Sequence, residues 1–314
     1  MRVATIDIGT NTVLLLIAEL GPSGQLVVVH ERATITRLGE GVDRFRKLSP
    51  EAVRRTRLCL DEYASLVTAS AVDRVAVVGT SAMRDAAGGE SLRVHVRSAF
   101  GVEVQVLSGE EEAQLTFRGA LSGLPLDDGG EVAVIDIGGG STEVVIGQGG
   151  PRGAGLRFAR SFDIGSVRLT ERLVAHDPPI AAELDALRRV AAETFEPVPP
   201  FGDSTRPVGV AGTVTTLAAV AFGVVPYDPA RLHGSELSYD TLRAIVSHLG
   251  SIDVEARRKV PGMEPKRADV IVAGGIVVLA LLEHWRARAL MVSDRGVRWG
   301  LADNLVREAQ AHAP

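Results

Sequence analysis

Apolar and polar positions divide this chain into short and longer segments. Short β-branched runs, bounded by glycine, proline or aspartate, predict buried strands, and longer runs with an apolar stripe predict helices. Strands are expected at 2–8, 12–20, 25–36, 72–78, 103–107, 131–137, 141–147, 156–162, 208–211, 233–238 and 290–293. The main helices are expected at 50–67, 91–100, from 108, at 167–175, 180–196, from 212, at 239–249, 253–258, 266–285 and 297–311.

A glycine-rich turn separates two of these apolar runs near the middle of the chain. The strand ending at Ile137 is followed by Gly138, Gly139 and Gly140, then by Ser141 and Thr142 and a second apolar run. Glycines let backbone N–H groups approach a ligand, and a cluster of free N–H groups suits a phosphate. Asp136 and Glu143 are close enough to serve a divalent cation beside that phosphate. A plain hairpin turn with a solvated aspartate is the alternative.

The N-terminus repeats this stretch. The seven residues from Val3 to Gly9 keep Val, Ala, Ile, Asp, Ile and Gly at the positions that these residue types occupy from Val132 to Gly138. Asp7 therefore corresponds to Asp136. A duplicated strand–loop–strand unit predicts two domains of similar build. Facing loops would form a cleft with one aspartate and one phosphate-type loop on each wall.

Other loops carry candidate chemistry. Arg84 follows small residues at the end of a predicted strand. Ser108 is a good N-cap, and Glu110, Glu111 and Glu112 in the first turn favour the helix dipole, although one of them could also enter the cleft. Gly212 and Thr213 join a strand to a helix, which is a phosphate-type arrangement. Lys266 and Arg267 open a helix and are either substrate guides or solvated cations.

Composition narrows the range of functions. The 314 residues are 46% hydrophobic and 4% aromatic, with a net charge of −5, so a nucleic-acid partner is not expected. Cys59 is the only cysteine, which excludes an intrachain disulfide. Neither a signal peptide nor an apolar span long enough for a membrane is found, so a cytoplasmic protein is expected. Zinc, serine-hydrolase, P-loop and dinucleotide motifs do not occur.

Taken together, the ordered motifs resemble the exopolyphosphatase / guanosine pentaphosphate phosphohydrolase (Ppx/GppA) family, within the actin, Hsp70 and sugar-kinase superfamily. The resemblance covers nearly the whole chain, and its blocks fall in the family's order. They are residues 6–12, 79–86, 108–113, 134–147, 163–168, 209–215, 266–275 and 292–296.

The resemblance implies an α/β fold of two ribonuclease-H-like (actin-like ATPase) domains that flank an active-site cleft. The first domain would span 1–125 plus 297–314, with the last helix packed back on it, and the second would span 126–296. This corresponds to the short, two-domain form of the family. A homodimer is also expected.

Phosphoanhydride hydrolysis needs an in-line water and neutralisation of negative charge, and this assigns roles to the candidate residues. Asp7 and Asp136 suit Mg²⁺ or Mn²⁺, with Glu143 as a third acid, and a monovalent cation is a further candidate cofactor. The family resemblance makes Glu112 the general base and Glu143 the acid that positions water or metal. Lys266 and Arg267 could guide a polyphosphate chain. The expected phosphate-binding residues are Thr10, Asn11, Arg84, Gly138, Gly139, Gly140, Ser141, Thr142, Gly212 and Thr213.

The expected function is that of an exopolyphosphatase, which releases terminal orthophosphate from inorganic polyphosphate by Mg²⁺-dependent hydrolysis. The first alternative is removal of the 5′-γ-phosphate of guanosine pentaphosphate (pppGpp) in the same site. An ATP-dependent kinase of the superfamily and a catalytically inactive phosphate sensor are remoter alternatives. The acid pair Glu112 and Glu143 favours hydrolysis over both.

Overall fold

The chain forms two compact units. The computed structural model describes residues 1–22, 24–126, 129–149, 155–202 and 205–311. Unit 1 comprises Met1–Gly119 together with Val297–Pro314, and unit 2 comprises Ala120–Gly296. The first boundary lies a few residues before the one expected at 125/126, whereas the second falls at the expected position.

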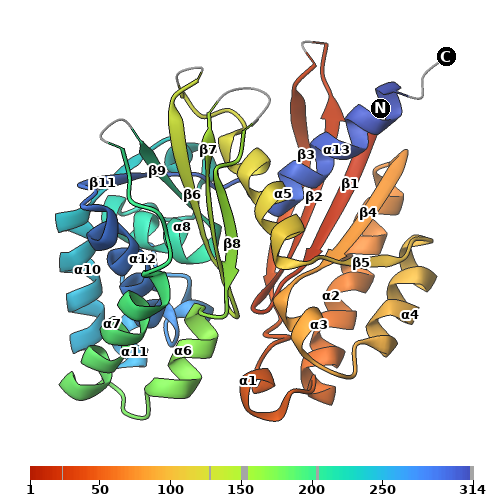
Figure 1. The fold of residues 1–314 in the computed structure, drawn as a ribbon. Helices are drawn as coiled ribbons and strands as arrows, with labels where there is room; N and C mark the ends of the chain where they lie inside the picture. Colours follow the sequence, from red (N-terminus) through yellow and green to blue (C-terminus); the bar gives the residue numbers. More distant parts are fainter. Residues whose placement is uncertain (23, 127–128, 150–154, 203–204, 312–314) are drawn as a thin grey trace. The chain divides into compact units, whose positions relative to one another are not determined.

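Unit 1 is a five-stranded sheet with helices on both faces (Figure 1). Its strands are β1 (Arg2–Ile8), β2 (Thr12–Leu20), β3 (Leu26–Ile35), β4 (Arg74–Gly79) and β5 (Val104–Val106), in the order β3-β2-β1-β4-β5. Its helices are α1 (Val42–Phe45), α2 (Pro50–Ala69), α3 (Ser81–Asp85), α4 (Glu90–Phe100) and α13 (Val297–Ala311), with most of α5 (Gly109–Leu121).

Alternation along β1 explains how this sheet is covered. Ala4, Ile6 and Ile8 share one core with residues of α2 and α4, whereas Val3 joins a separate core with Trp299 of α13. Successive strand residues point to opposite faces, so a strand buried on both sides needs apolar residues at every position. In β1 one face is apolar throughout, whereas the face toward α13 adds the buried polar residues Thr5 and Asp7 to Val3.

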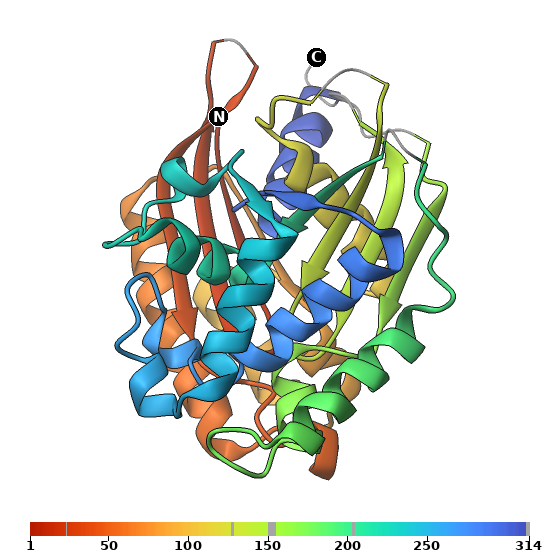
Figure 2. The same ribbon diagram turned by 90° about the vertical axis from the view of Figure 1, so that its left-hand side faces the viewer.

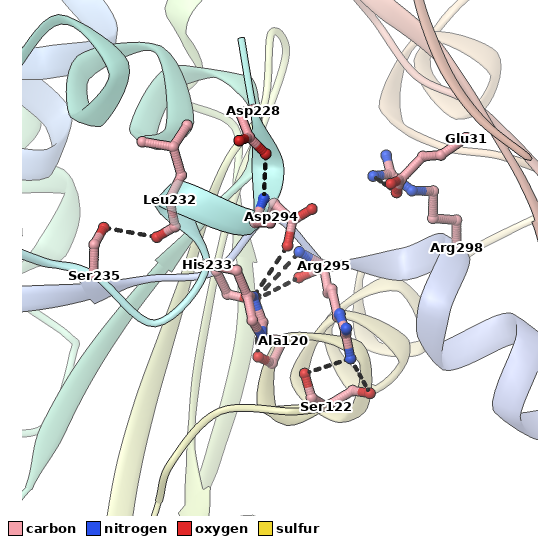
Figure 3. Close-up of polar contacts among 12 residues, drawn as sticks. Glu31, Ala120, Ser122, Asp228, Leu232, His233, Ser235, Asp294, Arg295 and Arg298 are labelled. Carbon is pink, nitrogen blue, oxygen red and sulfur yellow. Dashed lines mark hydrogen bonds and ion pairs between the residues drawn. The ribbon is translucent and has the colours of Figure 1, made fainter. Parts of the chain in front are cut away.

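Polar contacts fix α13 on the sheet. Thr5 Oγ1, which is buried, donates a hydrogen bond to the carbonyl oxygen of Arg298 at 2.9 Å. The Arg298 guanidinium is ion-paired with Glu31 of β3 (Figure 3). Two contacts from different strands therefore hold the first turn of α13.

Unit 2 is a six-stranded sheet with a larger helical cover (Figure 2). Its strands are β6 (Glu131–Ile137), β7 (Thr142–Gln148), β8 (Phe158–Phe162), β9 (Arg206–Val210), β10 (Glu236–Ser238) and β11 (Ala289–Val292), in the order β10-β11-β9-β6-β7-β8. Its helices are α6 (Ser166–Leu173), α7 (Ala181–Phe195), α8 (Ala211–Phe222), α9 (Pro229–Leu232), α10 (Tyr239–Ser251), α11 (Val254–Arg257) and α12 (Ile271–Trp285), with the 3₁₀ turn η1 (Pro265–Arg267).

The most apolar helix of unit 2 is α12, and it is buried along most of its length. It contributes a large share of the core that it forms with α7, α8 and α10. In the part of the chain that the structure describes, no helix combines the length and the hydropathy that a membrane crossing needs. The apolar character of α12 is therefore explained by the protein core.

The two sheets have the same topology. In unit 1 the antiparallel strands β3-β2-β1 continue into the parallel strands β4 and β5, and in unit 2 β8-β7-β6 continue in the same way into β9 and β11. The short antiparallel strand β10 extends only the second sheet. The duplication predicted from the repeated Asp-Ile-Gly sequence is confirmed.

Some short elements differ from the sequence prediction. The helix expected from residue 266 begins at Ile271, because Pro265 opens a separate 3₁₀ turn that the Glu264 side chain caps. Three helices of four or five residues, α1, α3 and α9, occur where loops were expected. Helices this short do not complete an apolar repeat, so they leave little signal in the sequence.

The segment that follows β11 is anchored to the end of α5. Ser293 Oγ donates to the carbonyl oxygen of Ala120 at 2.9 Å, and Arg295 Nη1 donates to that of Ser122 at 2.9 Å. Figure 3 shows the Arg295 side chain directed at Ser122 and His233 beside Asp294, with His233 Nδ1 3.0 Å from Asp294 Oδ1. All of these residues belong to unit 2. The motif at 292–296 therefore has a structural role.

Candidate active site

The glycine loop, residues 138–141, joins β6 to β7 beside two carboxylates. Asp136 and Glu143 are directly opposed in the antiparallel ladder. Opposed residues of a ladder project from the same face of a sheet, so the two side chains lie on one face. Ser161 Oγ on β8 donates a hydrogen bond of 2.6 Å to Glu143 Oε1. The hairpin thus places two acids on one face beside the loop, and Ser161 orients one of them, Glu143.

The first turn of α6 binds the carbonyl groups of the glycine loop. The bonds run from Ser166 N to Gly138 O at 3.0 Å, from Val167 N to Gly139 O at 2.9 Å and from Arg168 Nε to Gly140 O at 2.6 Å. Across a trans peptide, a C=O group and the following N–H group point in opposite directions. The N–H groups of residues 139, 140 and 141 therefore point away from α6. Three amides on one side of a loop form an anion-binding nest.

Two of the expected hydroxyl groups are bound within the fold. Thr142 Oγ1 donates to the carbonyl oxygen of Ile164 at 2.6 Å, and Thr213 Oγ1 donates to that of Ile137 at 3.1 Å. A hydroxyl has a single proton to donate. Phosphate contacts from Thr142 and Thr213 would therefore use groups other than these protons.

A second loop of unit 2 lies at the start of α8. Ala211 has a left-handed backbone with φ of 64°, a conformation that costs energy for a residue with a Cβ. The Arg267 guanidinium lies directly on Gly212, where an added Cβ would be 2.1 Å from Arg267 Cζ. The structure thus brings Arg267 to the predicted phosphate loop at Gly212, while Lys266 is exposed.

In unit 1, the corresponding loop of residues 9–11 follows Asp7. Opposite Asp7 in the ladder is Leu14, so this hairpin lacks a counterpart of Glu143. The carbonyl oxygen of Thr10 accepts the N–H of Gly39, and that of Asn11 accepts those of Thr36 and Arg37. The Asn11 side chain is 5% exposed, and within the described residues neither its oxygen nor its nitrogen has a hydrogen-bond partner. Buried amides normally have partners, so this one is suited to a ligand.

Unit 1 also brings together Arg84 and Glu112. Arg84 Nη1 donates to Glu112 Oε2 at 2.9 Å and to the carbonyl oxygen of Leu107 at 3.0 Å. Arg84 Nε lies 3.6 Å from Asp85 Oδ1. The guanidinium favours the ionised form of Glu112, which is the form that a general base requires. The phosphate contact expected of Arg84 stays a prediction.

The three consecutive glutamates occupy different environments. Glu111 completes a capping box, because its Oε2 accepts the backbone N–H of Ser108 at 2.8 Å while Ser108 Oγ accepts the N–H of Glu111 at 3.2 Å. The bonds from Ser108 lower the pKa of Glu111 below its ordinary value. Glu110 is exposed, and Glu112 alone of the three is ion-paired with Arg84. This geometry distinguishes Glu112 from its neighbours.

Asp136 and Glu143 fit a Mg²⁺ site that has only one or two carboxylate ligands. The described residues contain no group of three or more His, Cys, Asp or Glu arranged to hold a metal. Mg²⁺ in phosphate-handling proteins is commonly held by one or two carboxylates, with substrate phosphates and waters completing its shell. Asp136 and Glu143 on one sheet face match that donor set, whereas Asp7 belongs to the other unit.

Sequence reasoning missed two residues of this arrangement. Ser161 orients Glu143 across a strand pair, and Arg168 holds the glycine loop. Arg168 ends one of the family-like blocks, at 163–168, but its local sequence assigned it no task. Ser161 gave no signal, because its contact depends on how β7 and β8 pair.

Comparisons with known proteins show the family to which the chain belongs. The family model described as "Ppx/GppA phosphatase family" matches residues 16–309. Exopolyphosphatase 2 of Mycobacterium tuberculosis is 39% identical over 319 residues, which cover 97% of this chain and 98% of that protein. The crystal structure of the Aquifex aeolicus member of the Ppx/GppA family has a TM-score of 0.83 at 36% identity and covers 100% of this chain and 99% of that one. Guanosine-5′-triphosphate,3′-diphosphate pyrophosphatase of Photobacterium profundum is 27% identical over 98% of this chain and 60% of that protein.

Proposed function

Because the chain belongs to the Ppx/GppA phosphatase family, we propose that it is an exopolyphosphatase that releases the terminal orthophosphate of inorganic polyphosphate. Its two units have the actin-like ATPase fold of the family. The nearly full-length similarity to a mycobacterial protein named exopolyphosphatase 2 supports this substrate. A phosphoanhydride hydrolase is the enzyme class common to that relative and to the pyrophosphatase relative.

The glycine loop is the observation that carries the proposal. Its three amides point to one side, and Asp136 and Glu143 lie on one face of the hairpin that it closes. Amides neutralise phosphate oxygens without a protonation change, while adjacent acids suit the cation that accompanies a polyanion. A solvated turn would not need the carbonyl groups of its three glycines to be held by a helix.

Each residue has a role in the proposed hydrolysis. The nest at residues 139–141 binds the terminal phosphoryl group, and Glu112 accepts a proton from the attacking water. Arg84 is ion-paired with Glu112, and Glu143 orients the water or the cation. Asp136 and Glu143 would hold Mg²⁺, and the metal contact expected of Asp7 stays a prediction. When bound, this ion neutralises charge on the phosphate oxygens.

Hydrolysis of the 5′-γ-phosphate of pppGpp is the second candidate. The nest recognises a phosphoryl group, which both substrates present, and the chain is similar to a pppGpp pyrophosphatase along almost its whole length. The same chemistry serves both substrates, because both reactions cleave a terminal phosphoanhydride. We place polyphosphate first as the proposed substrate, because the relative with 39% identity is named exopolyphosphatase 2.

A substrate panel tests the proposal. Purified protein is incubated with long-chain polyphosphate, pppGpp and ATP in Mg²⁺, and both orthophosphate and the remaining polymer length are followed. We expect orthophosphate from the first turnovers while long polymer persists. Mid-sized fragments that appear before orthophosphate would exclude end-directed cleavage, and turnover of pppGpp alone would favour the second candidate. Phosphate transfer from ATP to an acceptor would indicate a kinase.

The proposal also includes a homodimer and a cytoplasmic location. The homodimer comes from the family resemblance, and the cytoplasmic location is the expectation stated in the sequence analysis. Sedimentation of the purified chain and fractionation of the cells that produce it would test them.

A further inference from the structure

The carbonyl groups of the three loop glycines are held in two different ways. Those of Gly138 and Gly139 accept backbone N–H groups from the first turn of α6. Gly140 O accepts the side chain of Arg168, through Nε, at 2.6 Å. Backbone donors are present whatever the sequence of the turn, whereas this third bond depends on the residue type at position 168.

The third carbonyl determines the direction of one amide of the nest. Gly140 C=O and Ser141 N–H belong to the same peptide unit, which is planar and trans. If Gly140 O is released, the peptide unit can rotate and Ser141 N–H loses its direction. Arg168 thereby controls an N–H group that it does not contact.

Burial shows that Arg168 is committed to this position. The residue is 5% exposed, and a buried guanidinium must be compensated by hydrogen bonds and charges. Its own N–H also donates to Gly139 O at 3.0 Å, so main chain and side chain bind adjacent loop carbonyls. Gly165 allows this close approach, because a Cβ there would lie 2.5 Å from Gly139 O.

We propose that Arg168 is a positioning residue for phosphate recognition, which acts through Gly140 O to aim Ser141 N–H at the bound phosphoryl group. This inference rests on the proposed function, since it assumes that the nest binds phosphate. It is distinct from a direct contact between Arg168 and substrate.

Two substitutions separate position from charge. In Arg168→Lys the Lys Cε takes the place of Arg Nε, so the positive charge is kept but the donor facing Gly140 O is lost. Arg168→Met removes both. If Arg168 acts by position, both variants should weaken inorganic phosphate binding by a similar factor, on the order of tenfold. If charge alone mattered, Arg168→Lys would behave as wild type.

Arg257 provides a matched structural control. It is a buried arginine of unit 2 whose Nε donates to the carbonyl oxygen of Leu249, also at 2.6 Å, far from the glycine loop in sequence. Arg257→Lys therefore removes an equivalent bond. We expect it to lower the melting temperature as Arg168→Lys does, but to leave phosphate binding intact.

Amide NMR of the ¹⁵N-labelled full-length protein, titrated with inorganic phosphate, provides the test. In wild type and in Arg257→Lys, the amides of Gly139, Gly140 and Ser141 should all shift. In Arg168→Lys, the Ser141 response should fall most while Gly139 still responds. An unchanged Ser141 response in Arg168→Lys, or equal losses in both lysine variants, would overturn the inference, as would the absence of any response in wild type.

Hydrolysis of polyphosphate is measured on the same wild-type sample. Intact amide responses without hydrolysis would refute the proposed function and leave the role of Arg168 standing. Hydrolysis together with an unaltered Ser141 response in Arg168→Lys would support the proposed function and refute the role of Arg168.

Discussion

The hairpins β1–β2 and β6–β7 have the same construction but carry different chemistry. In each, an aspartate near the end of the first strand precedes a loop closed by one hydrogen bond, from Gly9 N to Thr12 O at 3.1 Å or from Gly138 N to Ser141 O at 3.0 Å. Opposite the aspartate, however, the first hairpin has an apolar residue and the second has an acid. Only the second hairpin holds a pair of carboxylates.

The supports of the two loops differ as well. Loop carbonyls in unit 1 bind backbone N–H groups from the segment after β3, whereas those in unit 2 bind the first turn of a helix and a guanidinium. Unit 1 supplies its second acid from another element, as Glu112 of α5 paired with Arg84. Duplication therefore conserved the backbone of the hairpin, while the acids were placed separately in each unit.

The largest loss of activity is expected from substitution of Glu112, the acid that α5 contributes to unit 1. Glu112→Gln keeps the size of the side chain but removes the base, so kcat for polyphosphate should fall on the order of 10²-fold or more with KM little changed. Steady-state kinetics measure this. A near-normal kcat would transfer the role of base to Glu143.

Glu110→Gln and Glu111→Gln are the matched controls and should stay within a few-fold of wild type. Glu111→Gln should instead lower the melting temperature, because it weakens the capping box. Since the folded-state pKa of Glu111 is lowered, its stabilisation is present above the ordinary pKa of a glutamate and is lost as the pH falls through the lowered value. The difference in melting temperature should therefore disappear in acid.

The next effect compares the two aspartates. Asp136→Asn breaks up a carboxylate pair, whereas Asp7→Asn removes an acid that faces Leu14. We expect the Mg²⁺ concentration for half-maximal activity to rise about tenfold or more in Asp136→Asn and less in Asp7→Asn, because each carboxylate contributes to a sparse ligand set. Activity is titrated with Mg²⁺ after removal of metal. Wild-type rates in excess EDTA would contradict metal dependence altogether.

The smallest effect concerns the loop supports. In Gly165→Ala the new Cβ meets the backbone of Gly139 at 2.5 Å, so the nest must shift. In Gly39→Ala it meets Thr10 Cγ2 at 2.2 Å, and that side chain can rotate. KM for polyphosphate should rise several-fold more in Gly165→Ala than in Gly39→Ala, in proportion to the lost amide contacts. Equal KM values at equal melting temperatures would show that the two supports are equivalent.

Much of this protein follows from local sequence. The repeated Asp-Ile-Gly stretch predicted both hairpins, because β-branched runs joined by a short glycine turn favour antiparallel pairing with each other. The same repeat predicted two units of similar build, and their strand orders agree. The capping role of Glu111 also follows from its spacing to Ser108, since a box of this kind lies within one helical turn.

The remaining features were decided by tertiary structure. The partner of Glu112 is Arg84, 28 residues earlier, and the residue that holds Gly140 is Arg168, 28 residues later. Arg267 reaches Gly212 across a still longer separation. A guanidinium has a long, flexible side chain whose partner depends on which strands and helices meet, and the local sequence does not specify that meeting. The sequence by itself determined the loops and their acids. The packing of distant elements determined which arginine side chains contact them.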